Sequence, residues 1–290
     1  MDRIYLLAPP LLLLATMSLA FAVYCALCAV GRAPQVLGAK HNELLGPFVS
    51  RYLVWLIGPI ERLLLGRVSP NAITAASLAM CAWSGVEAGL GALGAATWIY
   101  ALAGILDVLD GRLARLTNQQ TKSGALFDSV SDRWGELFVF SGYAWYLRDT
   151  PYLLAVMGAI GGSMMVSYTR ARAEGLGLQL SGGMMQRAER ILLVTSGSLA
   201  AAWCAGDPET AWLTAPIVGG TMVVCAVGST ATAISRWVIA FRELARREAC
   251  AEKAAAAVAV AAAAAAPAQT AAPHYPAIPA KLRESAELGL

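Results

Sequence analysis

Residues 107–132 have the sequence DVLDGRLARLTNQQTKSGALFDSVSD. This interval holds two closely spaced pairs of acidic residues, Asp107 with Asp110 and Asp128 with Asp132. Spacings of i,i+3 and i,i+4 put the members of each pair about 60° and about 40° apart around a helix, so each pair shares one face. Only the short turn at 116–122 joins the two helices. We therefore expect antiparallel neighbours whose carboxylates face each other at one depth.

The composition indicates a membrane protein. Hydrophobic residues occupy 58% of the 290 positions and charged residues 14%, whereas a soluble domain carries about 25% charged residues. The missing charge indicates that lipid forms part of the solvent. The net charge is only +3, and no basic stripe is interleaved with aromatic residues. We therefore expect no nucleic-acid partner.

Long apolar runs predict seven membrane spans, at 4–31, 68–86, 94–115, 123–147, 151–173, 186–204 and 212–240. A cleaved signal peptide is the alternative for the first run, but its apolar part would be too long. Residues 42–67 mix apolar residues with charges, which predicts an amphipathic helix in the membrane interface. The expected fold is an all-α, polytopic transmembrane helix bundle.

Four parts are expected along the chain. Residues 1–41 form an N-terminal transmembrane helix and linker, and 42–67 form the interfacial helix. Residues 68–245 form the membrane domain that carries the aspartates. Residues 246–290 form a cytoplasmic tail, rich in alanine and proline, that we expect to be disordered.

Basic residues cluster in alternate connections. They are concentrated in 32–67, 112–122, 170–190 and 236–253, and the intervening connections are poor in them. This is the positive-inside pattern. It predicts a multi-pass protein of the plasma membrane whose aspartate site faces the cytoplasm.

The four aspartates need a positive partner. A carboxylate at the centre of a membrane helix costs about 2.5–3.5 kcal/mol on insertion scales. Hard carboxylate oxygens suit Mg²⁺ or Mn²⁺, and the cluster contains no histidine or cysteine that would suit zinc. A cation transporter that uses the aspartates as its transport site is an alternative of another class.

The same stretch resembles the signature of the CDP-alcohol phosphatidyltransferases, D-x-x-D-G-x-x-A-R-x(8)-G-x-x-x-D-x-x-x-D, at all eight fixed positions. The resemblance covers about 69–245 and implies a six-helix core, with the first helix and the interfacial helix as additions. It further implies that a CDP-linked lipid docks its pyrophosphate on two metal ions, that an acceptor hydroxyl attacks the lipid-side phosphate, and that CMP leaves.

Roles for individual residues follow from this resemblance. It implies that Asp107, Asp110 and Asp128 are metal ligands, and that Asp132 is both a ligand and the catalytic base. The residues that it implies for the cytidine diphosphate are Asn71, Thr74, Gly111, Arg115, Thr121 and Gly124.

A second resemblance concerns the acceptor. Residues 167–190 are similar to the phosphatidylinositol phosphate synthase branch and its archaeal ether-lipid relatives, in which three basic residues hold the acceptor's phosphate. The matching residues are Arg170, Arg190 and Arg236. Gln186 and Ala188 replace a glutamate and a proline of that branch, and Arg170 replaces a common lysine. The resemblance implies CDP-diacylglycerol as donor, inositol phosphate as acceptor and a homodimer.

Several alternatives stay open from the sequence. The acceptor could be glycerol phosphate, serine or free inositol, with the same chemistry. The three arginines could serve only as positive-inside anchors. Arg133 follows Asp132 but points about 100° away from it around the helix, so we expect it to pair with Glu136.

Overall fold

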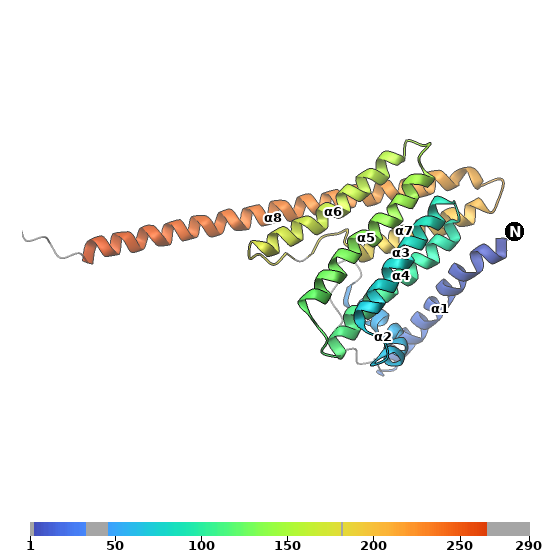
Figure 1. Ribbon diagram of the computed structural model, residues 1–290, viewed down its shortest axis with the longest axis horizontal. Helices are drawn as coiled ribbons and strands as arrows, with labels where there is room; N and C mark the ends of the chain where they lie inside the picture. The colour runs from blue at the N-terminus through green and yellow to red at the C-terminus, as the bar shows by residue number, and fades with distance from the viewer. Residues whose placement is uncertain (1–2, 33–45, 181, 266–290) are drawn as a thin grey trace, which may run out of the picture. The chain divides into compact units, whose positions relative to one another are not determined.

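The computed structural model describes residues 3–32, 46–180 and 182–265. Over these residues the regular structure is entirely helical, which confirms the all-α prediction (Figure 1). A short 3₁₀ turn, Ala211–Leu213, precedes the last helix. The α-helices are α1 (Arg3–Ala29), α2 (Gly46–Leu64), α3 (Pro70–Gly89), α4 (Leu93–Leu116), α5 (Lys122–Tyr146), α6 (Leu153–Gly175), α7 (Arg187–Ala205) and α8 (Thr214–Ala265).

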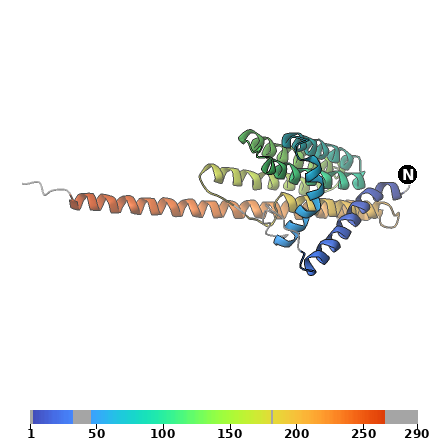
Figure 2. The same cartoon turned by 90° about the horizontal axis from the view of Figure 1, so that it is seen from below.

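Helix α3 is central to the packing around the aspartates. It packs extensively against both α4 and α5, and the two views agree on this arrangement (Figures 1 and 2). Among the described residues, α4 and α5 make few backbone contacts with each other. The expectation that they are direct neighbours is therefore wrong: α3 packs against both, and α4 and α5 approach mainly through their acidic side chains.

Small residues allow α3 to approach α5 closely. A Cβ atom added at Gly142 of α5 would lie 1.9 Å from the Gly85 carbonyl oxygen of α3. One added at Gly85 would lie 2.3 Å from the Phe138 carbonyl oxygen. Contacts of this kind need glycine, because any side chain would force the two backbones apart.

Helices α6 and α7 and the first part of α8 complete the core. Val218, Met222 and Cys225 of α8 are fully buried among apolar side chains of the other helices. A Cβ atom at Gly197 of α7 would lie 2.1 Å from the Thr221 hydroxyl oxygen. At this point Gly197 lets Thr221 of α8 lie directly against α7.

The first two helices pack on each other through aromatic rings. Phe21 and Tyr24 of α1 contact Phe48 and Tyr52 of α2, with ring centroids 5.0–6.1 Å apart. Farther along α2, Ile57 packs in a small apolar cluster with Ile73, Leu109 and Leu113.

A buried ion pair ties α2 to α4. Arg112 Nε donates to Glu61 Oε2 at 2.5 Å, and both side chains are about nine-tenths buried. This pair directly adjoins the aspartate motif, since Arg112 lies two residues after Asp110. Helix α2 is therefore anchored to the helix that carries the first two aspartates.

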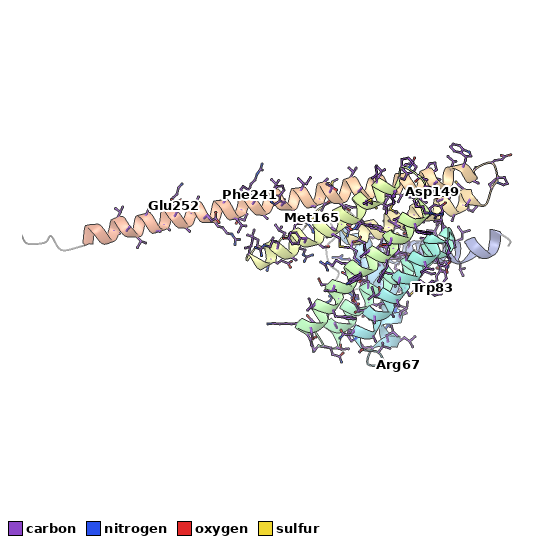
Figure 3. All side chains as sticks on the ribbon, turned by 45° about the horizontal axis from the view of Figure 1, so that its top comes forward. Arg67, Trp83, Asp149, Met165, Phe241 and Glu252 are labelled. Carbon is purple, nitrogen blue, oxygen red and sulfur yellow. The ribbon has the colours of Figure 1, made fainter. Side chains whose placement is uncertain are left out.

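Two helices within the described ranges are long and apolar enough to cross a membrane by length and composition. They are Leu93–Leu116, with a mean hydropathy of 1.4, and Ala211–Ala261, with 1.8. Large apolar side chains also face outward, as at Trp83 and Met165 (Figure 3). Exposed apolar surface of this kind fits a lipid environment. The seven spans and the interfacial position of 42–67 stay predictions.

The chain divides into two compact units, residues 1–240 and 241–290. The described part of the second unit is helical to Ala265, so the disorder expected from residue 246 is wrong for 246–265. Alanine has the highest helix propensity, and adding residues to an existing helix avoids the cost of nucleation. Glu243 also accepts hydrogen bonds from Arg246 and Arg247 at 2.9 Å. Residues 266–290 lie outside the described residues.

The close approach of α3 and α5 gives a test of the fold. Gly142→Ala should destabilise the protein by about 1–3 kcal/mol, because the methyl group has no room and two backbones must shift. Gly161→Ala on α6 is the matched control, since nothing lies within 4 Å of the added Cβ atom. Thermal unfolding in detergent should show a lower midpoint for Gly142→Ala only. Equal midpoints in the two variants would contradict the packing.

Candidate metal centre

Three of the four aspartates meet between α4 and α5. One carboxylate oxygen from each of Asp107, Asp110 and Asp128 lies within 4.8 Å of the others. Asp110 is 3% exposed, and its Oδ2 accepts a hydrogen bond from the Thr74 hydroxyl at 2.5 Å. Asp107 and Asp128 are half-buried. We call Asp107, Asp110 and Asp128 the aspartate triad.

The aspartate triad fits a divalent cation. Oxygen ligands around one Mg²⁺ ion lie about 2.0–2.1 Å from the metal, so opposite ligands are about 4.2 Å apart. A separation within 4.8 Å needs little closure to reach that geometry. Carboxylate oxygens are also the donors that Mg²⁺ and Mn²⁺ prefer. The i,i+3 pair on α4 and the first acid of the α5 pair are thus brought together as the sequence predicts.

Asp132, the fourth aspartate, has an arginine partner. Arg187 Nη1 donates to Asp132 Oδ1 at 2.5 Å, and the same nitrogen forms an ion pair with Asp107 Oδ1. All three side chains are about three-quarters to four-fifths buried. Arg187 therefore links Asp132 to the aspartate triad. A role for Asp132 as metal ligand or base stays a prediction.

A second ion pair lies one helical turn away. Arg190 of α7 donates two hydrogen bonds to the Glu136 carboxylate of α5, and both side chains are at least 97% buried. Asp132 and Glu136 are i,i+4 on α5, and Arg187 and Arg190 are i,i+3 on α7. Two ion pairs, Asp132 with Arg187 and Glu136 with Arg190, therefore join α5 to α7.

Arg133 does not pair with Glu136, so that expectation is wrong. Its guanidinium donates to the backbone carbonyl and, at 2.6 Å, to the hydroxyl of Ser129 on its own helix. Glu136 instead faces α7, where Arg190 donates one hydrogen bond to each of its carboxylate oxygens. The sequence spacing gave no information on which face of α5 meets α7.

A cavity of about 170 Å³ opens beside the aspartate triad. Asp110 and Asp128 line it, together with the start of α3, the end of α4 and the turn into α5. All six residues that the family resemblance implies for the cytidine diphosphate also line it: Asn71, Thr74, Gly111, Arg115, Thr121 and Gly124. Residues from 71 to 128 thus converge on one space.

Two helix N-termini border this cavity. Ser69 caps α3, and Thr121 caps α5 by accepting a hydrogen bond from the Gly124 amide at 3.0 Å. Helix N-termini favour anions, because their free amide groups and the helix dipole are positive there. Gly124 is needed for the close fit, since an added Cβ atom would lie 2.9 Å from the Thr121 hydroxyl oxygen and 3.3 Å from Asn71 Oδ1.

The three arginines implied for the acceptor have different surroundings. Arg170 is about half-exposed and pairs with Glu174 at 2.8 Å on the same helix. Arg190 is fully buried against Glu136. Arg236 is 5% exposed and donates to the carbonyls of Gly182 and Val166. The loop at 182–186 links the last two, because Arg190 also donates to the Met185 carbonyl at 2.9 Å.

Sequence reasoning missed Arg187. Arg187 lies in the basic 170–190 connection and in the stretch that resembles the phosphatidylinositol phosphate synthase branch, and neither pattern gives it a role at the aspartates. Its partners lie 55 and 80 positions away along the chain, so no helical periodicity connects them. The usable signal is that Arg187 and Arg190 are i,i+3 and so share one face of their helix, as Asp132 and Glu136 at i,i+4 share one face of theirs.

The metal centre predicts the behaviour of one variant sharply. Asp128→Asn should weaken Mn²⁺ binding by at least about tenfold, because even the loss of a supporting group around a ligand costs 10–100-fold. Asp149→Asn is the control, since this carboxylate is exposed and pairs only with its neighbour Arg148 (Figure 3). Calorimetric titration with Mn²⁺ measures both. Equal affinity in the two variants would contradict the assignment of Asp128 to the aspartate triad.

The chain is similar in sequence to known phospholipid synthases. Phosphatidylinositol phosphate synthase of Mycobacterium tuberculosis is 35% identical over 143 residues, which are 48% of this chain and 62% of the relative. Archaetidylinositol phosphate synthase of Methanothermobacter thermautotrophicus is 38% identical over 128 residues, 44% of this chain and 64% of the relative. The chain thus spans less than two thirds of the length of these curated relatives.

Solved structures agree with the sequence relatives. The crystal structure of the M. tuberculosis phosphatidylinositol phosphate synthase with CDP-DAG bound gives a TM-score of 0.56 at 29% identity, and covers 64% of this chain and 94% of that one. Its complex with manganese and citrate gives 0.56 at 28% identity, with 63% and 88% covered. The family model of the CDP-alcohol phosphatidyltransferases matches residues 67–230, more than half of the chain. The chain belongs to the CDP-alcohol phosphatidyltransferase family.

Proposed function

We propose that this protein transfers a phosphatidyl group from CDP-diacylglycerol to the hydroxyl of a polar acceptor and releases CMP. One observation carries the proposal: the aspartate triad opens on a cavity lined by the residues that the family uses for a cytidine diphosphate. The solved relative with CDP-DAG bound supports the choice of donor.

The cavity suits the donor's pyrophosphate. Two helix N-termini and Arg115 border it and favour negative charge. Divalent ions held by the aspartate triad, Mg²⁺ or Mn²⁺ and two in number, would neutralise the pyrophosphate and polarise the bond to CMP. The relative solved with manganese supports a divalent ion. Thr74 holds Asp110 in place through its hydroxyl hydrogen bond.

The chemistry proposed is an in-line displacement at phosphorus. The acceptor's hydroxyl oxygen bonds to the phosphorus that carries the diacylglycerol, and the bond from that phosphorus to the oxygen of CMP breaks. The acceptor's proton passes to a carboxylate, for which we propose Asp132 as general base. The contact with Arg187 places this carboxylate beside the aspartate triad.

Inositol phosphate is the acceptor that we propose. The sequence relatives are named for inositol phosphate products, and three arginines, Arg170, Arg190 and Arg236, match the residues that hold the acceptor's phosphate in that branch. Arg170 is the most accessible of the three. Arg190 and Arg236 already bind protein groups and would have to exchange or share those partners. Glycerol phosphate, serine and free inositol are the alternatives.

We place the protein in the plasma membrane as a multi-pass homodimer with its site on the cytoplasmic side. The alternating basic connections support the orientation, and the outward-facing apolar side chains support contact with lipid. The dimer rests on the family resemblance alone. Cation transport is less well supported, because a transport site has no need of the six residues that line the cavity.

A product assay tests the reaction and its acceptor together. The purified protein is incubated with CDP-diacylglycerol, Mg²⁺ and each acceptor in turn, and the lipid product is identified by mass spectrometry. We expect CMP release with inositol phosphate to exceed that with the other three acceptors. If CMP were released only with one of the other acceptors, the proposed acceptor would be wrong and the proposed transfer reaction would stand. No CMP release with any of them would contradict the transferase proposal.

The arginine most accessible to the acceptor gives a finer test. Arg170→Gln should raise the KM for inositol phosphate about tenfold or more, because a charge-assisted hydrogen bond is worth about 1.5–3 kcal/mol. The KM for CDP-diacylglycerol should change little. Arg148→Gln is the control, since this arginine is also half-exposed and paired with a nearby acid. A uniform change for both substrates would indicate an anchor rather than a phosphate contact.

Arg190→Gln is a poor test of the same idea. Removing one partner of a buried ion pair costs about 3–5 kcal/mol, because the other charge is left uncompensated. Loss of activity in that variant would report on the stability of the protein as much as on the acceptor.

A further inference from the structure

One guanidinium nitrogen of Arg187 forms ion pairs with two aspartates that have different proposed roles. Nη1 contacts Oδ1 of Asp107, a member of the aspartate triad, and Oδ1 of Asp132, the proposed base. The Arg187 side chain is 19% exposed, so solvent screens these contacts weakly. The Nε of the same guanidinium is buried and has no hydrogen-bond partner. The guanidinium is therefore held at the cluster chiefly by the two carboxylates.

The backbone holds Arg187 in this place. It is the first residue of α7, and the loop before it is fixed to α8, where the Thr232 hydroxyl accepts a hydrogen bond from the Met185 amide at 3.1 Å. Gly183 in this loop has a φ of +118°, and an added Cβ atom would lie 2.4 Å from Thr232 Cγ2. Behind Arg187, the buried pair of Arg190 with Glu136 sets the rotation of α7 about its axis.

We propose that Arg187 is a positioning residue that acts as a built-in counter-cation of the metal centre: it competes with the divalent ion for Asp107 and holds Asp132 toward the acceptor. This inference rests on the proposed metal site. The guanidinium and a metal ion are both attracted to the same carboxylate, so each weakens the hold of the other. Such coupling is reciprocal by thermodynamic necessity.

The fourth aspartate, Asp132, binds the same guanidinium nitrogen as Asp107. Without Arg187, the four carboxylates would face a divalent ion with no competing positive charge beside them. The ion pair with Arg187 holds the Asp132 carboxylate close to the site.

The test is a titration with Mn²⁺ alone, followed by the electron paramagnetic resonance signal of the free ion, on the full chain in detergent. Arg187→Gln should bind Mn²⁺ at least about tenfold more tightly than the wild type, a factor that corresponds to about 1.4 kcal/mol. Arg133→Gln is the matched control. It removes the same charge next to Asp132 in the sequence, but its guanidinium binds Ser129 and not the aspartates. Its affinity should stay within about twofold of the wild type.

Two further variants separate charge from stability. Arg187→Lys keeps the positive charge and should bind Mn²⁺ much as the wild type does. Arg187→Gln in the background of Asp132→Asn leaves no orphaned carboxylate at position 132, so it should fold even if the single variant does not. It should still bind Mn²⁺ about tenfold more tightly than Asp132→Asn alone.

Steady-state kinetics then give a readout that a purely structural role would not change. At saturating Mn²⁺, Arg187→Gln should lose turnover by about tenfold or more while the KM for CDP-diacylglycerol changes little, because the donor is held at the cavity and not by Arg187. Unchanged or weaker Mn²⁺ binding in Arg187→Gln, or an equal gain in Arg133→Gln, would overturn the proposal. A wild type that binds no Mn²⁺ would overturn the metal site itself, and with it this inference.

Discussion

The constraint on which the rest of the structure depends is the concentration of four carboxylates in a chain with only 14% charged residues. Like charges at this density repel one another, and a half-buried site cannot use water to screen them. The protein responds with opposite charge from two sources. Arg187 supplies one positive group, and the aspartate triad is shaped to accept another from a metal ion.

The surrounding fold supports this arrangement. Helix α3 packs against both acid-bearing helices because glycines allow backbone contact with α5, and it delivers the Thr74 hydroxyl to Asp110. The ion pair of Glu61 with Arg112 holds α2 against α4. The ion pairs of Arg187 and Arg190 with acids of α5 hold α7 in place. The buried Glu136 and Arg190 thus lie one helical turn from Asp132 and Arg187, so the two ion pairs order neighbouring side chains of α5 and α7.

Patterns local in the sequence predicted much of the site, whereas contacts between residues far apart in the sequence could not be predicted. The spacing of the aspartates predicted that Asp107, Asp110 and Asp128 meet, because helical periodicity fixes which side chains share a face. The family resemblance also named six residues that line one cavity. Sequence reasoning missed Arg187 and mispaired Arg133, because partners on another helix depend on how the helices rotate and pack. It also expected disorder in the alanine-rich segment after residue 246, where helix propensity extends α8 instead.

The central claim is that the aspartate triad is the metal centre around which the protein is organised. Anomalous X-ray scattering from crystals grown with Mn²⁺ tests it most directly, because the signal locates the ion without reference to activity. We expect an anomalous peak within coordination distance of Asp107, Asp110 and Asp128, beside the cavity that Arg115 and Thr121 line. A crystal that contains Mn²⁺ only elsewhere, with these three carboxylates bound to no ion, would contradict it.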